Sequence, residues 1–454
     1  MTSKSRQVSL KICRVLHAGY LFECDETRIL FDPIFENPFS VNCFAFPPVR
    51  FDLPLLEKER FSAVFISHFH DDHCSLKSLN LLDRRTPIFI YCLHGELMDW
   101  IRDLGFRDVR QLRLDVEIEV GPFKITPRRA FDADVDSLFQ IRVGELNILN
   151  VVDSLLDSET LSLLKKESPW NLVLWPFQMM RELAVIAPTR TIQEPVKVPD
   201  ESIDELASLK PHFVVPSSCQ FVHEPWSWYN HALFPMTYRQ FTDEVHSRVP
   251  GTRVVRMDPG TSFLLDGTSF SQTESLKWVQ PCGEQNVDFD YQPERLPTST
   301  SEIAKCFPPL SHEERDRVQS YCVTELPRIY RSLDVPEFFR EPRVWLLCLF
   351  DEAGKESRFY YRIEMENVEL LPTAVESIAW KTEVIITKLF AALERGETMS
   401  SMYLRVNDHR FDPRAEEALG EAEVLDDPLI RTLFTGQFGA YQLAQLKDLE
   451  AESL

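Results

Sequence analysis

The feature that most restricts how this chain can fold is a group of polar side chains placed directly after an apolar run. Residues 63–66, Ala-Val-Phe-Ile, are typical of a buried strand, and His68, His70, Asp72 and His73 follow within one turn-sized segment. Burying such side chains is costly unless a partner satisfies them. A divalent cation is the simplest partner for imidazoles and carboxylates, so the spacing predicts a metal site at the end of this strand.

The spacing also predicts how the ligands divide. His68 and His70 are two residues apart at a strand end, so both can point toward one ion. Asp72 and His73 lie on the following turn and face a second position, which predicts one or two divalent ions (Zn, Fe or Mn), with Asp72 also able to act as a catalytic base. Ser75 is expected to cap a helix just beyond. The alternative is a histidine-rich surface loop without metal.

Bulk composition restricts the partners. The 454 residues carry 71 acidic and 49 basic side chains, a formal charge of −22, which argues against nucleic acid and favours a small-molecule substrate. An anionic substrate would need local positive charge or metal. No apolar run is long enough for a membrane span, and the first residues lack a secretory signal, so we expect a cytoplasmic protein. The ten cysteines contain no C-x-x-C pair, which predicts reduced thiols.

The order His-x-His-x-Asp-His resembles the signature of the metallo-β-lactamase-fold superfamily. This resemblance implies an α/β fold, the αββα sandwich. Phe31-Asp32-Pro33 and His17-Ala18-Gly19 are similar to the branch of ascorbate-phosphate lactonases and N-acyl-phosphatidylethanolamine-hydrolysing phospholipases. Asp32 is a candidate to accept a hydrogen bond from a ligating imidazole. His17 is either close to the metals or a structural histidine.

Asp153 follows the apolar strand of residues 146–152, Leu-Asn-Ile-Leu-Asn-Val-Val. The resemblance implies that this carboxylate bridges the metals. A carboxylate at the end of a buried strand needs a partner in any case. The alternative is that Asp153 caps the helix expected over residues 154–166.

A histidine that the superfamily pattern supplies is missing before Asp153. Residues 127–139 contain Asp132, Asp134 and Asp136 in its place, and we take Asp132 and Asp134 as candidate ligands. A carboxylate in place of an imidazole favours iron or manganese over zinc. Alternatively, the chain binds a single metal or has lost catalysis.

The final histidine of the pattern is also displaced. His223 and His231 are the next histidines after Val215-Pro216, and either is a candidate metal ligand. They flank an aromatic group, Trp226, Trp228 and Tyr229, which is expected to form a pocket wall or an interface.

A weaker resemblance points to a different chemistry. The Pro-x-x-Cys segment at Pro216 and the tail over residues 380–446 resemble the non-Rieske part of CMP-N-acetylneuraminate hydroxylase. Cys92-Leu93-His94 has the first half of a Rieske motif, but no C-x-x-H follows it, so the Rieske cluster is absent. This resemblance implies a dinuclear iron oxygenase that uses another electron source.

The chain is expected to divide into a metal-binding domain over residues 1–280, a linker over 281–312 and a C-terminal α+β domain over 313–454. In the last of these, a hairpin turns at Glu352-Ala353-Gly354-Lys355, and an amphipathic helix over 374–394 ends at Gly396.

Three functions follow from these patterns. The leading hypothesis is a metal-dependent hydrolase of an ester, lactone or phosphodiester that uses a metal-activated water. The second is a dinuclear iron oxygenase of a small metabolite. The third is a non-catalytic scaffold stabilised by metal.

Overall fold

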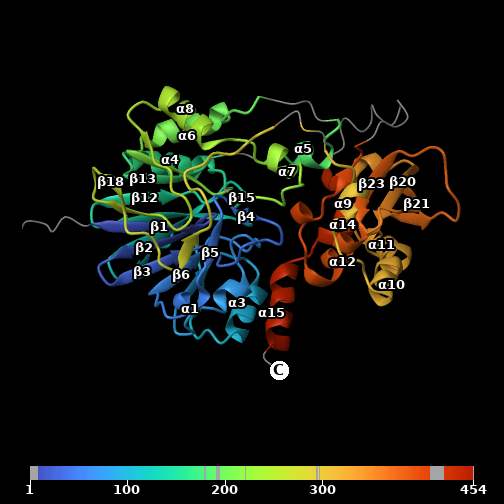
Figure 1. Ribbon diagram of the computed structural model, residues 1–454, viewed down its shortest axis with the longest axis horizontal. Coiled ribbons are helices and arrows are strands. Elements are labelled where there is room, and N and C mark those ends of the chain that lie inside the picture. Colours follow the sequence, from blue (N-terminus) through green and yellow to red (C-terminus); the bar gives the residue numbers. More distant parts are fainter. Residues whose placement is uncertain are drawn as a thin grey trace, which may run out of the picture.

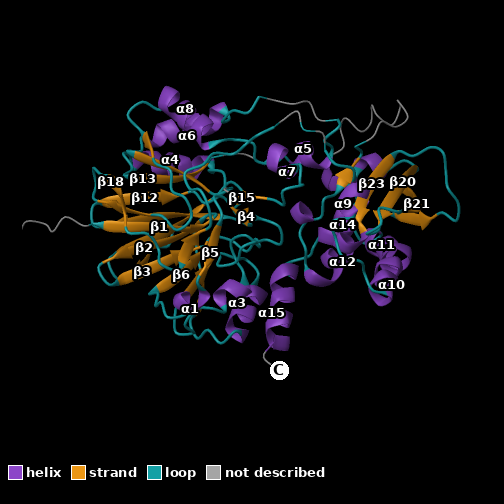
Figure 2. Cartoon of the chain, in the orientation of Figure 1, coloured by secondary structure: helices purple, strands orange, loops and turns teal. Residues whose placement is uncertain are grey.

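The computed structural model describes residues 9–177, 180–190, 195–219, 221–292, 295, 297–408 and 424–452. The first part of the chain forms two facing β-sheets with helices on both outer faces, and the last part forms a smaller sheet with its own helices (Figure 1). Figure 2 shows the two layers of strands enclosed by helices. The predicted αββα sandwich is therefore confirmed.

The first sheet has eight strands. β1, β2 and β3 form an antiparallel meander, and β3, β6, β7 and β8 run parallel. A hairpin joins β2 and β3, with Asp25 in its turn at a φ of 51°. In spatial order the strands are β18 (Phe270–Thr273), β17 (Ser262–Leu265), β1 (Leu10–Leu16), β2 (Gly19–Cys24), β3 (Thr27–Phe31), β6 (Ala63–Ile66), β7 (Ile88–Ile90) and β8 (Val109–Gln111).

The second sheet has seven strands and the same mixed character. β9 to β12 pair antiparallel, whereas β12, β13, β14 and β16 run parallel. In spatial order the strands are β16 (Arg253–Val254), β14 (Phe213–Ser217), β13 (Leu172–Pro176), β12 (Leu146–Asn150), β11 (Ser137–Val143), β10 (Phe123–Arg129) and β9 (Ile118–Val120).

The central core lies between the two sheets. Phe31 and Phe65 of the first sheet meet Phe139 of the second, with ring centroids 5.2 and 6.1 Å from it. The four residues of β6 are all buried because both faces of this strand are covered. This burial explains why residues 63–66 form a continuous apolar run.

Helices cover the two outer faces. The first sheet carries α1 (Leu53–Leu56), α2 (Leu76–Leu79) and α3 (Gly95–Asp103), and the second carries α4 (Ser158–Lys166), α6 (Asp200–Leu209) and α8 (Tyr238–Arg248) (Figure 1). Ser75 caps α2 as predicted, since its side chain accepts a hydrogen bond from the amide of Ser78. Two pairs of short strands lie outside the two sheets: β4 (Phe44–Ala45) pairs with β15 (Phe221–Val222), and β5 (Val49–Phe51) pairs with β19 (Val279–Pro281). The short helices α5 (Glu182–Ile186) and α7 (Tyr229–Ala232) contribute buried residues to the core of the C-terminal part.

The C-terminal part is an α+β unit. Its sheet has the order β22 (Asn367–Leu370), β21 (Glu356–Glu364), β20 (Arg343–Phe350), β23 (Trp380–Ile385) and β24 (Arg405–Val406). The helices packed around it are α9 (Thr300–Ala304), α10 (His312–Ser320), α11 (Leu326–Tyr330), α12 (Ile386–Arg395) and α14 (Pro428–Phe434), with a π-helical turn at Tyr321–Glu325. The division of the chain at 281–312 stays a prediction, although α9 lies inside that segment and contacts β20 and β23.

One prediction in this part is wrong. Residues 374–394 do not form one helix, because Trp380–Ile385 is the strand β23, which pairs parallel with β20. The helix α12 begins only at Ile386 and ends, as predicted, at Gly396 in the left-handed conformation. The hairpin of β20 and β21 is as predicted.

The last helix, α15 (Ala440–Glu452), leaves the C-terminal part and contacts α2 and α3 of the first (Figure 1). Among the described residues, no helix combines the length and apolar character needed to cross a bilayer. All ten cysteines lie within the described ranges, and none of them forms a disulfide.

Candidate metal centre

Strand directions bring four separate segments to one edge of the sandwich. β1 and β6 run in the same direction, so the turn after β1, which carries His17, lies at the same edge as the segment after β6. In the second sheet β11 is antiparallel to β12, so Asp136, just before β11, lies at the same edge as Asp153, just after β12. Ser137 joins the two sheets here, because its hydroxyl donates a 2.8 Å hydrogen bond to the carbonyl of Ser67.

The first group of candidate ligands consists of His17, Asp72, His73 and Asp153, with one ligand atom of each lying within 4.8 Å of the others. His17 Nε2 is 3.2 Å from Asp72 Oδ2 and also 3.2 Å from His73 Nε2. His73 Nε2 is in turn 3.0 Å from Asp153 Oδ2. Two imidazole nitrogens and two carboxylates therefore point at one small volume.

The second group consists of His68, His70 and Asp136, which meet the same 4.8 Å criterion. His68 Nε2 lies 3.8 Å from Asp136 Oδ1 and 4.0 Å from Asp153 Oδ1. Asp153 thus presents one oxygen to each group. This is the arrangement that a carboxylate shared between two ions requires.

Partners behind the ligands determine which imidazole nitrogens are available. Asp32 accepts hydrogen bonds from the amide and hydroxyl of Ser67, and its Oδ2 lies 3.2 Å from His73 Nδ1. Because the Ser67 hydroxyl donates to Asp32, it accepts from His68 Nδ1 at 2.9 Å. In the neutral ring of each histidine the proton then lies on Nδ1, so Nε2 is the nitrogen that faces the centre and would bind an ion. Asp32 has the role predicted for it from the sequence.

Arg14 fixes the turn that carries His17. Its guanidinium is fully buried and donates two hydrogen bonds, of 3.2 and 2.8 Å, to the carbonyl of His17. Further hydrogen bonds of 3.0 Å each go to the carbonyls of Pro216 and Met257. His17 has a φ of 50°, a conformation that non-glycine residues rarely adopt. The buried guanidinium holds the turn in this conformation.

Burial and close contact shift the pKa values of the acids and imidazoles at this centre. Burial and the charge of Asp153 raise the pKa of Asp136 to about 6. Burial and the neighbouring His73 hold the pKa of His68 well below its usual value. For His73, burial alone would lower the pKa, but the charges of Asp153 and Asp72 outweigh it and raise the pKa well above its usual value.

Buried polar atoms without a hydrogen-bond partner indicate that this centre can bind cations. Among the described residues, no hydrogen-bond partner is found for the buried atoms His17 Nδ1, Asp136 Oδ1 and Asp153 Oδ1. Buried carboxylate oxygens are normally satisfied by donors or by metal. The residues therefore fit two divalent ions, one per group, with Asp153 between them.

The other predicted ligands lie elsewhere. Asp132 and Asp134 are exposed on the loop before β11, and only Asp136 on that loop reaches the centre. His231 faces Gln292 and Arg295, with its Nδ1 3.1 Å from the amide of Gln292.

His223 is buried among aromatic rings, 5.6 Å from Phe221 and 5.2 Å from Tyr229 between ring centroids, and does not belong to either ligand group. Sequence reasoning named His17 and Asp136 but did not choose them as ligands. Their places directly after one strand and directly before another are the signal that could have selected them.

Asp153 is not a helix cap. The helix after it, α4, is capped by Asp157, whose side chain accepts hydrogen bonds from the amides of Glu159 and Thr160. The alternative interpretation of Asp153 from the sequence is therefore excluded. Its carboxylate remains available to the metal centre.

No family model matches this sequence. Similar solved structures include a metallo hydrolase from Ignicoccus hospitalis, at 16% identity and a TM-score of 0.39, covering 56% of this chain and 98% of that one. The match to the metallo-β-lactamase-fold protein YhfI from Bacillus subtilis has 14% identity and a TM-score of 0.36. It covers 56% of this chain and 98% of the YhfI chain. The match to the diiron β-hydroxylase CmlA from Streptomyces venezuelae has 15% identity and a TM-score of 0.37. It covers 58% of this chain and 55% of the CmlA chain.

These structural neighbours are a metallo hydrolase, a metallo-β-lactamase-fold protein and a diiron β-hydroxylase. They do not single out the lactonase and phospholipase branch. Because the TM-scores are below 0.5, the fold assignment rests on the two facing sheets and their helices.

Proposed function

We propose that this protein is a metal-dependent hydrolase with a two-metal centre that acts on an ester, a lactone or a phosphodiester. The observation that supports this most directly is the position of Asp153, whose two oxygens face two separate groups of histidine and aspartate ligands. Bound divalent ions supply Lewis acidity and lower the pKa of a coordinated water toward neutrality.

The residues of the chain have distinct parts in this proposal. His68, His70 and Asp136 hold one ion, and His17, Asp72 and His73 hold the other. Asp32 and Ser67 accept the Nδ1 protons of His73 and His68, so Nε2 is the nitrogen of each ring that would bind an ion. Asp72 is also the candidate base, although both of its oxygens face histidines, with Oδ2 3.2 Å from His17 Nε2 and Oδ1 3.7 Å from His73 Nε2.

The surroundings favour a small molecule. A net charge of −22 disfavours nucleic acid, and we propose a small-molecule substrate and a cytoplasmic location. The paired cations are then the positive charge that would receive an anionic substrate group.

A dinuclear iron oxygenase is the second candidate. Asp136 supports this function, because its carboxylate completes the group of His68 and His70 in place of a third imidazole. Oxygen-rich ligand sets suit manganese and iron better than zinc.

Metal analysis of protein purified without added metal separates these functions. The hydrolase should contain zinc or manganese and cleave ester, lactone or phosphodiester substrates without oxygen, whereas the oxygenase should contain paired iron with oxygen-dependent turnover. His70→Ala and Asp153→Asn should each lower the metal content, and the exposed control Asp132→Asn should not. A metal-free wild-type protein would contradict both enzymes and the metal-stabilised scaffold as well.

A further inference from the structure

The C-terminal helix α15 contacts the segment that carries the central ligands. We call residues 67–74, between β6 and α2, the ligand loop; His68, His70, Asp72 and His73 belong to it. The loop has no helix or strand of its own, so its shape depends on its neighbours. Figure 1 shows α15 beside α3, on the side of the first part that faces the C-terminal part.

Gln442 of α15 binds two carbonyl groups of the ligand loop with one amide group. Its Nε2 donates hydrogen bonds of 2.7 Å to the carbonyl of Phe69 and 2.9 Å to the carbonyl of Cys74. The side chain is 2% exposed, so water does not replace these bonds. The two carbonyls flank the stretch with His70, Asp72 and His73, and one side chain therefore fixes the distance across it.

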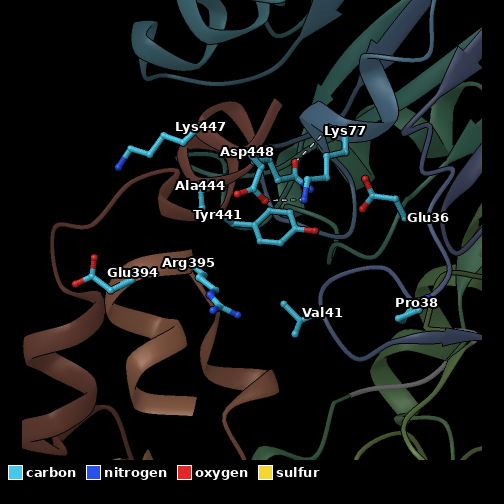
Figure 3. A pocket seen from close by; sticks show the side chains of 11 residues that line it. Glu36, Pro38, Val41, Lys77, Glu394, Arg395, Tyr441, Ala444, Lys447 and Asp448 are labelled. Atoms are coloured by element: carbon cyan, nitrogen blue, oxygen red, sulfur yellow. Dashed lines mark hydrogen bonds and ion pairs between the residues drawn. The ribbon is translucent and has the colours of Figure 1, made fainter. Parts of the chain in front are cut away.

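Gln445, one helical turn further, holds the residues that follow the loop. Its Oε1 accepts a 2.7 Å hydrogen bond from the amide of Leu76, and its Nε2 donates a 3.1 Å hydrogen bond to the hydroxyl of Ser75. The polar groups at the start of α2 therefore obtain part of their hydrogen bonds from α15. Figure 3 shows this contact region, with Asp448 paired to Lys77 at 2.8 Å and the Tyr441 ring directed toward Glu36.

Apolar contacts bring the helix into place. Phe438, just before α15, stacks on His94 with ring centroids 4.0 Å apart and meets the loop residue Phe69 at 4.8 Å. Leu446 is buried in the core cluster that covers the outer face of the first sheet. The polar contacts of Gln442 are therefore made from a seated helix rather than from a mobile tail.

From this geometry we infer that α15 is a clamp that shapes the ligand loop for metal binding, with Gln442 as its main positioning residue. The inference rests on the metal centre proposed above. Ordering a loop costs conformational entropy, so a loop that is already held binds its ions more tightly. Because coupling between two binding events is reciprocal, bound metal also tightens the docking of α15.

The test compares metal affinities of variants. Gln442→Met keeps the length of the side chain and removes both donated hydrogen bonds. We expect Zn²⁺ and Mn²⁺, titrated against a chromophoric chelator, to bind roughly tenfold more weakly, as for other changes behind metal ligands. The gain in unfolding midpoint on adding metal should shrink in parallel.

Two matched controls separate the clamp from a general loss of stability. Lys447→Met changes an exposed side chain of the same helix. Gln140→Met removes a buried glutamine of β11 that bonds Arg128 and Asn147 instead of the ligand loop. Both variants should bind metal as the wild type does.

The outcomes distinguish this inference from the proposed function. A wild-type protein that binds no metal overturns the proposed function. A wild type that binds metal and a Gln442→Met variant that binds it equally well overturn the clamp alone. If the variant does not fold, hydrogen exchange of the wild type decides: added metal should increase protection in Ala440–Glu452 but not in β20, and unchanged protection of α15 overturns the clamp.

Discussion

Asp136 distinguishes this centre from one with histidine at the same place. Its carboxylate completes the group that contains His68 and His70, so it affects which metal that group prefers. Changing Asp136→His should raise the ratio of zinc affinity to manganese affinity by about tenfold, because imidazole suits zinc better than carboxylate does. The measurement is a competitive titration of the metal-free protein with both ions.

Asp134→His is the matched control, because it introduces the same side chain at an exposed position of the same loop. It should leave the ratio unchanged. Equal ratios in the wild type and the Asp136→His variant would remove Asp136 from the ligand set.

Because His223 is buried, we expect a pH dependence of stability that is independent of the metal centre. Burial lowers its pKa from 6.5 to about 4, and both ring nitrogens lie without a well-formed hydrogen bond among the described residues. The unfolded chain therefore takes up a proton at a pH where the folded protein does not, so stability is lost as the pH falls from 6.5 toward 4. For the wild type this loss should be about 2 kcal/mol between pH 7 and pH 5.

Urea unfolding of the metal-free protein at the two pH values measures this loss. His223→Phe should remove that part of the pH dependence, because the new ring fits the aromatic surroundings and does not titrate. His246→Phe changes an exposed histidine of α8 and should keep it. A wild type and a His223→Phe variant with the same pH dependence would contradict the assignment.

Spacing along the chain predicted His68, His70, Asp72 and His73 because their geometry is local. His17 and Asp136 could not be selected in the same way, since they approach the centre only through the pairing of separate strands. His223 and His231 have the right chemistry, but packing turns the first into an aromatic cluster and the second toward Arg295.

At the scale of elements, the error at residues 374–394 has a physical cause. Val384 and Ile385 are β-branched, and every residue of Trp380–Ile385 except Lys381 is buried. The apolar positions fit a helical period as well, so local pattern alone did not decide between the two. Pairing with β20 decided it, and this contact is not visible in a single segment of sequence.

Gly439 has no side chain, which allows the start of α15 to approach the first part of the chain closely. Its φ is 60°, and an added Cβ would lie 2.4 Å from Cζ3 of Trp100 on α3. Gly436 has a φ of 71° but open space around its Cβ position. Gly436→Ala should therefore lower the free energy of unfolding by about 1–2 kcal/mol, through the backbone conformation alone. Gly439→Ala should lower it by roughly 1–3 kcal/mol more, because its Cβ also clashes with Trp100.

Chemical unfolding of the two variants measures the difference. Trp100→Leu in the Gly439→Ala background should recover part of the loss by making room. Equal destabilisation by the two glycine substitutions would show that α15 does not pack closely on Trp100.

At the scale of the whole molecule, the two parts of the chain share one aromatic interface. Trp226, Trp228 and Tyr229, predicted as pocket wall or interface, surround Tyr403 of the C-terminal part with ring centroids 5.0, 5.7 and 5.0 Å from it. Thr398 reaches Asp71 of the ligand loop at 3.3 Å. Contacts between distant segments, which the composition of residues 281–312 does not encode, join the two parts of the chain.

The hydroxyl of Tyr403 tests whether this interface stabilises the metal-binding part. It accepts a 3.0 Å hydrogen bond from Asn42 and donates one to Glu224, both in the first part of the chain. Tyr403→Phe leaves these buried groups unsatisfied and should cost about 1–3 kcal/mol. The matched change Tyr361→Phe removes a 2.7 Å hydrogen bond to the carbonyl of Cys322, inside the C-terminal part.

Hydrogen exchange distinguishes local from shared effects. Tyr403→Phe should lower protection in β4 and β15 of the first part as well as in β24, because the lost bonds cross between the parts. Tyr361→Phe should lower protection only around β20 to β22. If both variants affect the C-terminal part alone, the hydroxyl of Tyr403 does not stabilise the metal-binding part of the chain.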